Sequence, residues 1–232
     1  MVSIGFCGDS NVYGVGVTTQ TRFPNLVQKD CNVYGVPGAC NREIFEQAVE
    51  SISENDITIC MWSAPGRDRF SPHYGLQCTT GNNKSVLSYL SDSKMKTFND
   101  VYHLLDTDYN QIVQLERYTK LLDRLNKNVY YLPGLHFVSD TFFDNKPAKY
   151  DNTDERTKQI IQFDHLDDKE IESAVNYCRE MYKNIFSSKW IQNKKDIAID
   201  KGTDGIHMGP KSHRQLADKI IKYFKDEGID IG

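Results

Sequence analysis

Short apolar runs alternate with longer segments of helical periodicity along this chain. Apolar and β-branched residues dominate positions 2–7, 31–34, 56–62 and 128–132, which predicts short buried strands. The segments 22–29, 41–53, 109–126, 168–186 and 210–224 are predicted to be helices. Strands that alternate with helices are typical of a mostly parallel sheet with helices on both faces. We therefore expect an α/β protein built in three layers.

Three of the predicted helices have an apolar face that should pack against this sheet. The faces are Ile44, Phe45, Ala48, Val49 and Ile52 in 41–53; Ile112, Val113, Leu115, Tyr118, Leu121, Leu122 and Leu125 in 109–126; and Leu216, Ala217, Ile220, Ile221 and Phe224 in 210–224.

Two polar stretches, 63–108 and 133–167, interrupt the alternation, and each follows the carboxyl end of a predicted strand. They could overhang a site as specificity loops, or they could be surface insertions that pack locally. No interdomain linker is visible in the 232 residues. We expect a single domain over 1–232 that carries these two insertions.

Composition excludes several classes of protein. The formal charge is -4 and no basic stripe is present, which argues against a protein that binds nucleic acid. No run approaches the roughly 20 apolar residues of a membrane span, and no signal peptide is visible. The six cysteines include no C-x-x-C pair, and the histidines have no closely spaced partners, so neither a metal site nor a cofactor is expected. A cytoplasmic location is the expectation that follows.

Polar or glycine-containing turns follow the first three predicted strands. Ser10 comes after the first strand, Gly38 after the second and Ser63 after the third. Right-handed crossovers place the carboxyl ends of parallel strands at one edge, where ligands bind in such folds. We expect these three positions to converge on one rim.

A serine, a histidine and an aspartate could work together at this rim. A serine hydroxyl becomes a good nucleophile when a neighbouring base takes its proton, and histidine suits that task. An acidic partner holds the imidazole in the required tautomer. Ser10 is the candidate nucleophile, and Asp204 lies three residues before His207, with Gly205 permitting a tight turn between them.

These motifs resemble those of the SGNH-hydrolase superfamily, the GDSL-type esterases. The first block is Gly8-Asp9-Ser10-Asn11-Val12-Tyr13-Gly14, the last is Asp204-Gly205-Ile206-His207, and Gly38, or else Gly35, fits the second. The resemblance implies a flavodoxin-like α/β/α sandwich. It also implies that Ser10 is the nucleophile and that Asp204 positions His207 as the base. The N–H groups of Ser10 and Gly38 would then form part of an oxyanion hole.

The third block departs from that superfamily. Its members have Gly-x-Asn-Asp after the third strand, and the asparagine side chain donates to the oxyanion. Here the strand continues as Trp62-Ser63-Ala64-Pro65-Gly66-Arg67-Asp68-Arg69, without an asparagine. Ser63 or an arginine (Arg67 or Arg69) could replace it, the site could be slow, or activity could be lost. Trp-Ser with a following arginine resembles a variant of this block in phage-encoded members, which favours replacement and adds a virion as an alternative location.

Each candidate also has a structural interpretation. Asp9 and Ser10 could cap a helix, Asp204 and His207 could be surface residues before the last helix, and Gly38 could be a simple turn glycine. The remaining histidines and Trp62 are expected to be structural.

Two functions are consistent with the sequence. The first is a serine esterase that removes a small acyl group, for example an O-acetyl group from a carbohydrate, through an acyl-enzyme on Ser10. The polar and aromatic residues of the two insertions favour a sugar ester. The alternative is an inactive or weakly active module that keeps the fold and binds carbohydrate or serves a structural role.

Overall fold

The computed structural model describes residues 2–63, 67–71, 76–79, 108–133, 189, 191 and 198–232. Its elements are β1 (Ile4–Cys7), α1 (Ser10–Tyr13), α2 (Phe23–Val27), β2 (Asn32–Val33), α3 (Asn41–Glu54), β3 (Ile57–Trp62), β4 (Arg67–Ser71), β5 (Leu76–Thr79), α6 (Asp108–Leu125), β6 (Val129–Pro133) and α10 (Pro210–Asp226). The predicted helix over 168–186 lies outside the described residues.

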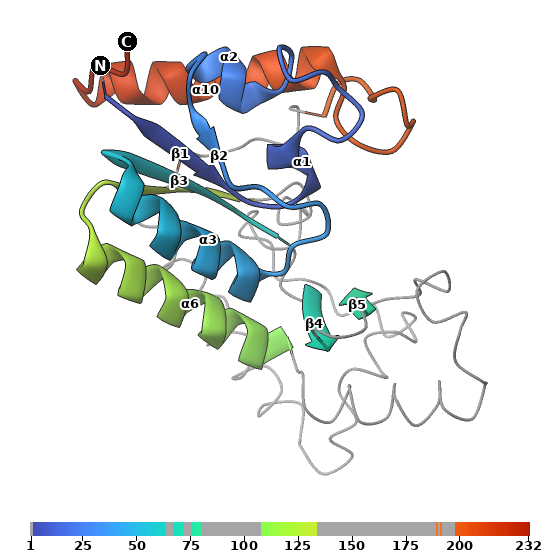
Figure 1. Cartoon of the computed structure of the whole chain (residues 1–232), viewed down its shortest axis with the longest axis vertical. Coiled ribbons are helices and arrows are strands. Elements are labelled where there is room, and N and C mark those ends of the chain that lie inside the picture. Colours follow the sequence, from blue (N-terminus) through green and yellow to red (C-terminus); the bar gives the residue numbers. More distant parts are fainter. Residues whose placement is uncertain are drawn as a thin grey trace, which may run out of the picture.

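The main sheet is parallel and has the order β2-β1-β3-β6. Helices α2 and α10 cover one face of it, and α3 and α6 cover the other (Figure 1). This arrangement confirms the predicted three-layer α/β fold, with a strand order that begins as in flavodoxin-like sheets. Within the insertion 63–108, β4 and β5 pair as an antiparallel hairpin.

The strands are apolar on both faces because each face is covered. In β3, Ile57, Ile59 and Met61 belong to the core beneath α10, whereas Cys60 and Trp62 belong to the core beneath α3 and α6. Such two-sided burial explains why the strands look like continuous apolar runs in the sequence.

The width of the buried helix faces was partly mispredicted. All five predicted apolar positions of α10 are buried or partly buried in the core. In contrast, Val49 of α3 and Leu121 and Leu125 of α6 are 40%, 46% and 59% exposed. Each of these helices rests on the sheet along a narrow stripe, and apolar periodicity does not indicate how wide that stripe is.

Candidate active site

Ser10 is the first residue of α1, directly beyond the end of β1. Asp9 is the N-cap, and its carboxylate accepts a hydrogen bond of 3.0 Å from the N–H of Asn11. Gly8 is required before it, because a Cβ there would lie 2.3 Å from a methyl group of Val12. The capping interpretation is therefore correct for Asp9, and it leaves Ser10 at a helix N-terminus. Ser10 as a whole residue is 8% exposed.

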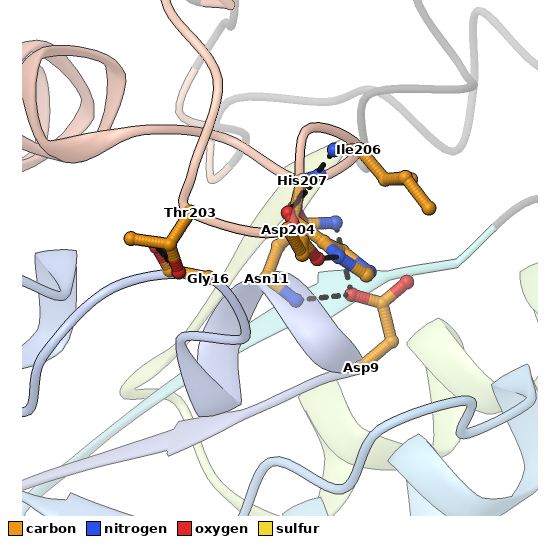
Figure 2. Close-up of polar contacts among 7 residues, drawn as sticks. All are labelled: Asp9, Asn11, Gly16, Thr203, Asp204, Ile206 and His207. Carbon is orange, nitrogen blue, oxygen red and sulfur yellow. Dashed lines mark hydrogen bonds and ion pairs between the residues drawn. The ribbon is translucent and has the colours of Figure 1, made fainter.

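Asp204 and His207 form a hydrogen-bonded pair in the loop before α10 (Figure 2). The carboxylate also accepts the N–H groups of Ile206 at 3.0 Å and His207 at 3.1 Å. The hydrogen bond from the His207 ring, followed by that from Ile206, lowers the pKa of Asp204 to about 2. An ionised carboxylate can only accept, so Nδ1 of His207 carries the proton of this hydrogen bond, and in the neutral ring the lone pair is on Nε2. This is the tautomer that a general base requires.

The loop of Asp204 docks on the turn that follows Ser10. Thr203 donates to the carbonyl of Gly16 from its N–H at 2.9 Å and from its hydroxyl at 3.2 Å (Figure 2). The contact is close, since a Cβ on Gly16 would lie 2.9 Å from a carboxylate oxygen of Asp204. The loop that carries Asp204 thus lies against the turn that follows Ser10, although the two segments are far apart in the sequence.

Ser10 and His207 are not joined by a hydrogen bond in the part of the chain that the structure describes. Of the two hydrogen bonds that the predicted triad requires, the one between His207 and Asp204 is present. The one between His207 and Ser10 is absent among the described residues. In enzymes without substrate, catalytic hydrogen bonds are often long and tighten only in the complex.

Gly38 lies in the turn after β2 and adopts the left-handed conformation, with φ of 79°. The turn is closed by a hydrogen bond of 3.0 Å from Ala39 N–H to the Val36 carbonyl. Among the described residues, neither Gly38 N–H nor Ser10 N–H has a hydrogen-bond acceptor. Their role as oxyanion donors stays a prediction.

Gly35, the other candidate for the second block, has a packing role. A Cβ at this position would lie 2.8 Å from a Val12 methyl group and 2.9 Å from the backbone nitrogen of Tyr13. The adjacent Val36 N–H donates to the Gly8 carbonyl at 3.1 Å. These contacts press the loop after β2 against the turn of Ser10.

Ser63 lies at the end of β3 and is buried. Its N–H donates to the side-chain oxygen of Asn41 at 2.8 Å, and its hydroxyl donates to Asp9 at 3.3 Å. Arg67 and Arg69 lie on β4, but their side chains are outside the described part of the structure. The sequence reasoning missed Asn41, although a polar residue just after the Gly38 turn is a signal that could have pointed to it.

His213 is structural, as predicted. Its Nδ1 accepts a hydrogen bond of 3.1 Å from Phe23 N–H, and its ring stacks on that of Phe23. Burial lowers the pKa of His213 to about 4. Trp62 is also fully buried and stacks on Tyr118 and Tyr131. His73, His103, His136 and His165 lie outside the described residues.

The described residues contain no cluster of three or more His, Cys, Asp or Glu side chains arranged to hold a metal ion. Cys7, Cys31, Cys40 and Cys60 are not joined in disulfide bonds. None of the described helices combines the length and the apolar character that crossing a membrane requires.

Comparison with protein families and curated proteins gives no match. Solved structures do match, and they include members of the superfamily that the motifs resemble. The psychrotrophic esterase EstA from Pseudoalteromonas sp. is 12% identical, with a TM-score of 0.47, over 98% of each chain. A member of the lipolytic G-D-S-L family from Veillonella parvula is 14% identical, with a TM-score of 0.41, over 97% of this chain and 99% of that chain.

A third match is the acetyl xylan esterase Est2A from the rumen bacterium Butyrivibrio proteoclasticus. It is 12% identical, with a TM-score of 0.49, over 97% of this chain and 64% of that chain. Similarities this distant carry no argument about the activity of this chain.

Proposed function

We propose that this chain is a serine esterase that removes a small acyl group from its substrate through an acyl-enzyme on Ser10. The observation that carries the proposal is the hydrogen-bonded Asp204–His207 pair, docked through Thr203 and Gly16 on the turn that follows Ser10. The pair holds the imidazole in the tautomer that a general base requires.

In this reaction Nε2 of His207 accepts the proton of the Ser10 hydroxyl as its oxygen attacks the ester carbonyl. The N–H groups of Ser10 and Gly38 donate to the oxyanion of the tetrahedral intermediate. The intermediate then expels the alcohol, which takes the proton from His207, and leaves Ser10 acylated. Water, activated by the same nitrogen, releases the acid and restores the enzyme.

An acyl ester on a carbohydrate is the substrate class that we favour. The support comes from the sequence: the insertions 63–108 and 133–167 follow strands whose carboxyl ends form the site edge, and both are rich in polar and aromatic residues. Aromatic rings stack on sugar rings, whereas a lipid ester would call for a more apolar surface.

Reaction with a fluorophosphonate probe tests the nucleophile. We expect wild type to be labelled on Ser10 and Ser10→Ala to remain unlabelled. Ser53→Ala is the control and should react like wild type, because Ser53 is exposed on α3, away from the candidate site. A panel of acetylated sugars and nitrophenyl esters of increasing chain length then defines the substrate. Equal labelling of Ser10→Ala and wild type would refute the proposal.

A non-catalytic module that binds carbohydrate is the second candidate. It is favoured by the missing third-block asparagine and by the lack of a Ser10–His207 hydrogen bond among the described residues. This function predicts that an acetylated oligosaccharide binds equally well to wild type and Ser10→Ala and is not hydrolysed by either. Calorimetric titration together with product analysis separates the two functions.

A further inference from the structure

Ser63 is the first residue after β3, in the segment where the resembling superfamily has its Gly-x-Asn-Asp block. Its side chain is not arranged as a replacement donor. The hydroxyl donates to Asp9, and a serine hydroxyl has only one hydrogen. In the observed conformation the hydroxyl therefore has no second hydrogen to donate to an oxyanion. This points to a different role for Ser63.

Asp9 connects Ser63 to the turn that carries the candidate nucleophile. One carboxylate oxygen accepts the N–H of Asn11 at 3.0 Å and its side-chain amide at 3.2 Å, and the other oxygen accepts Ser63. Ser10 lies between Asp9 and Asn11 in the chain. The orientation of the Ser10 N–H is consequently set by a carboxylate that Ser63 helps to hold.

Asn41 connects Ser63 to the second loop of the site. It is the first residue of α3 and follows the Gly38 turn by three positions, and its side-chain oxygen accepts the N–H of Ser63. The helix start is itself fixed, because the Glu43 carboxylate accepts the N–H of Cys40 at 3.0 Å. The position of Gly38 is thereby tied to the end of β3.

We infer that Ser63 is a positioning residue that acts through Asp9 and Asn41 to set the separation and direction of the Ser10 and Gly38 N–H donors. Three loops, one after each of β1, β2 and β3, are joined by this chain of buried polar groups. The inference rests on the proposed esterase reaction for its catalytic consequence, but the structural link can be measured without activity.

The substitution Ser63→Ala removes the hydroxyl and keeps the backbone contact with Asn41. We expect kcat for ester hydrolysis to fall about 10- to 100-fold, with KM changed less than about 3-fold, because small displacements of reacting groups have effects of this size. Ser63→Thr keeps the hydroxyl and should restore most of kcat. Ser51→Ala is the matched control: it also removes a buried, hydrogen-bonded hydroxyl, at a site that packs against Gly5, and should leave kcat unchanged.

A double-substitution cycle with Asp9→Asn distinguishes positioning from direct donation. If Ser63 acts through Asp9, Ser63→Ala has little further effect on kcat in the Asp9→Asn background. If Ser63 donates to the oxyanion itself, the substitution lowers kcat by the same factor in both backgrounds, and the inference is wrong.

Amide hydrogen exchange provides a readout that is independent of catalysis and of whether Asp9→Asn folds. The amides of residues 11–13, which donate to Asp9, should exchange faster in Ser63→Ala than in wild type, and at wild-type rates in Ser63→Thr. Unchanged exchange in Ser63→Ala overturns the inference whatever the activity. Faster exchange in Ser63→Ala, together with a wild-type protein that neither hydrolyses esters nor reacts with the probe, would refute the proposed function and retain the structural link.

Discussion

Asp204 accepts hydrogen bonds from two N–H groups of its own loop and from the ring of His207. The first two shape the loop, and the third selects the tautomer of the imidazole. Because these bonds hold the pKa of Asp204 at about 2, the carboxylate stays ionised at neutral and mildly acidic pH. The Asp204 side chain thus determines both the position of His207 and the tautomer of its ring.

Asp204→Asn should keep the shape of the side chain and remove its charge. An amide can donate to Nδ1 of His207 and select the wrong tautomer, so we expect kcat to fall about 10³- to 10⁴-fold with little change in KM. Steady-state kinetics on the best nitrophenyl ester measure this. A loss of less than about tenfold would mean that Asp204 does not position the base.

His213 makes the free energy of unfolding depend on pH. Its pKa is about 4 in the folded protein and about 6.5 when exposed. Between pH 4 and 6.5, His213 is therefore protonated in the unfolded state but not in the folded state. The free energy of unfolding consequently falls as pH decreases from about 6.5 to about 4. Above that window the group contributes no pH dependence.

In urea unfolding at pH 7, 6, 5 and 4.5, we expect His213 to contribute a loss of up to about 2–3 kcal/mol at the acid end. His213→Asn is the control, because its side-chain oxygen can replace Nδ1 as the acceptor for Phe23 and does not titrate. The difference between the free energies of unfolding of wild type and His213→Asn, followed over pH, gives the contribution of His213. A wild-type curve parallel to that of His213→Asn would contradict the prediction.

At the scale of elements, the site depends on how the loop before α10 docks on the turn after α1. Gly202 and Gly16 are in direct backbone contact: a Cβ on Gly202 would lie 2.7 Å from the carbonyl oxygen of Gly16 and 2.9 Å from its Cα. Backbone atoms cannot rotate away as a side chain would. The close approach is what carries Asp204 and His207 to the turn of Ser10.

Gly202→Ala should therefore separate the two segments. We expect kcat to fall about 100-fold and the free energy of unfolding to fall by about 1–3 kcal/mol. Gly228→Ala is the matched control, because this glycine after α10 has φ of 72° and open space around it. That substitution should cost about 1 kcal/mol of stability and leave kcat unchanged. Equal kinetics for both variants would show that the docking contact does not position the site.

At the scale of the whole molecule, α10 closes one face of the sheet and brings the end of the chain to its beginning (Figure 1). Phe224 is fully buried in this interface, and its ring meets that of Tyr130 of β6 edge to face at 4.8 Å. On the opposite face, Leu125 of α6 was predicted to be buried and is instead largely exposed.

These two residues make a matched pair for truncation. Phe224→Ala should lower the free energy of unfolding by about 3–5 kcal/mol, because it leaves a cavity in the core. Leu125→Ala should change it by less than about 0.5 kcal/mol. Urea titration followed by circular dichroism measures both values. Similar losses in the two variants would mean that Leu125 is buried in solution.

The alternation of apolar runs and helical periodicity was enough to predict β1, β3, β6, α3, α6 and α10 to within a few residues, because each of these elements buries a repeating set of side chains. The same periodicity could not separate Leu122, which is buried, from Leu121 and Leu125, which are exposed. That difference depends on how α6 rests on the sheet and beside its neighbours, which no local pattern records.

The α/β class and the succession of strands and helices could be predicted from the sequence alone, which also named Ser10, Asp204 and His207 as candidates for a triad. These follow from local periodicity and from residue type. Only the tertiary structure decided that Asp204 holds His207 and that their loop rests on Gly16. It also decided that Ser63 is engaged by Asp9 and Asn41 from the neighbouring loops. Such contacts join residues far apart in the chain, so they depend on the packing of the sheet and its helices rather than on any local pattern.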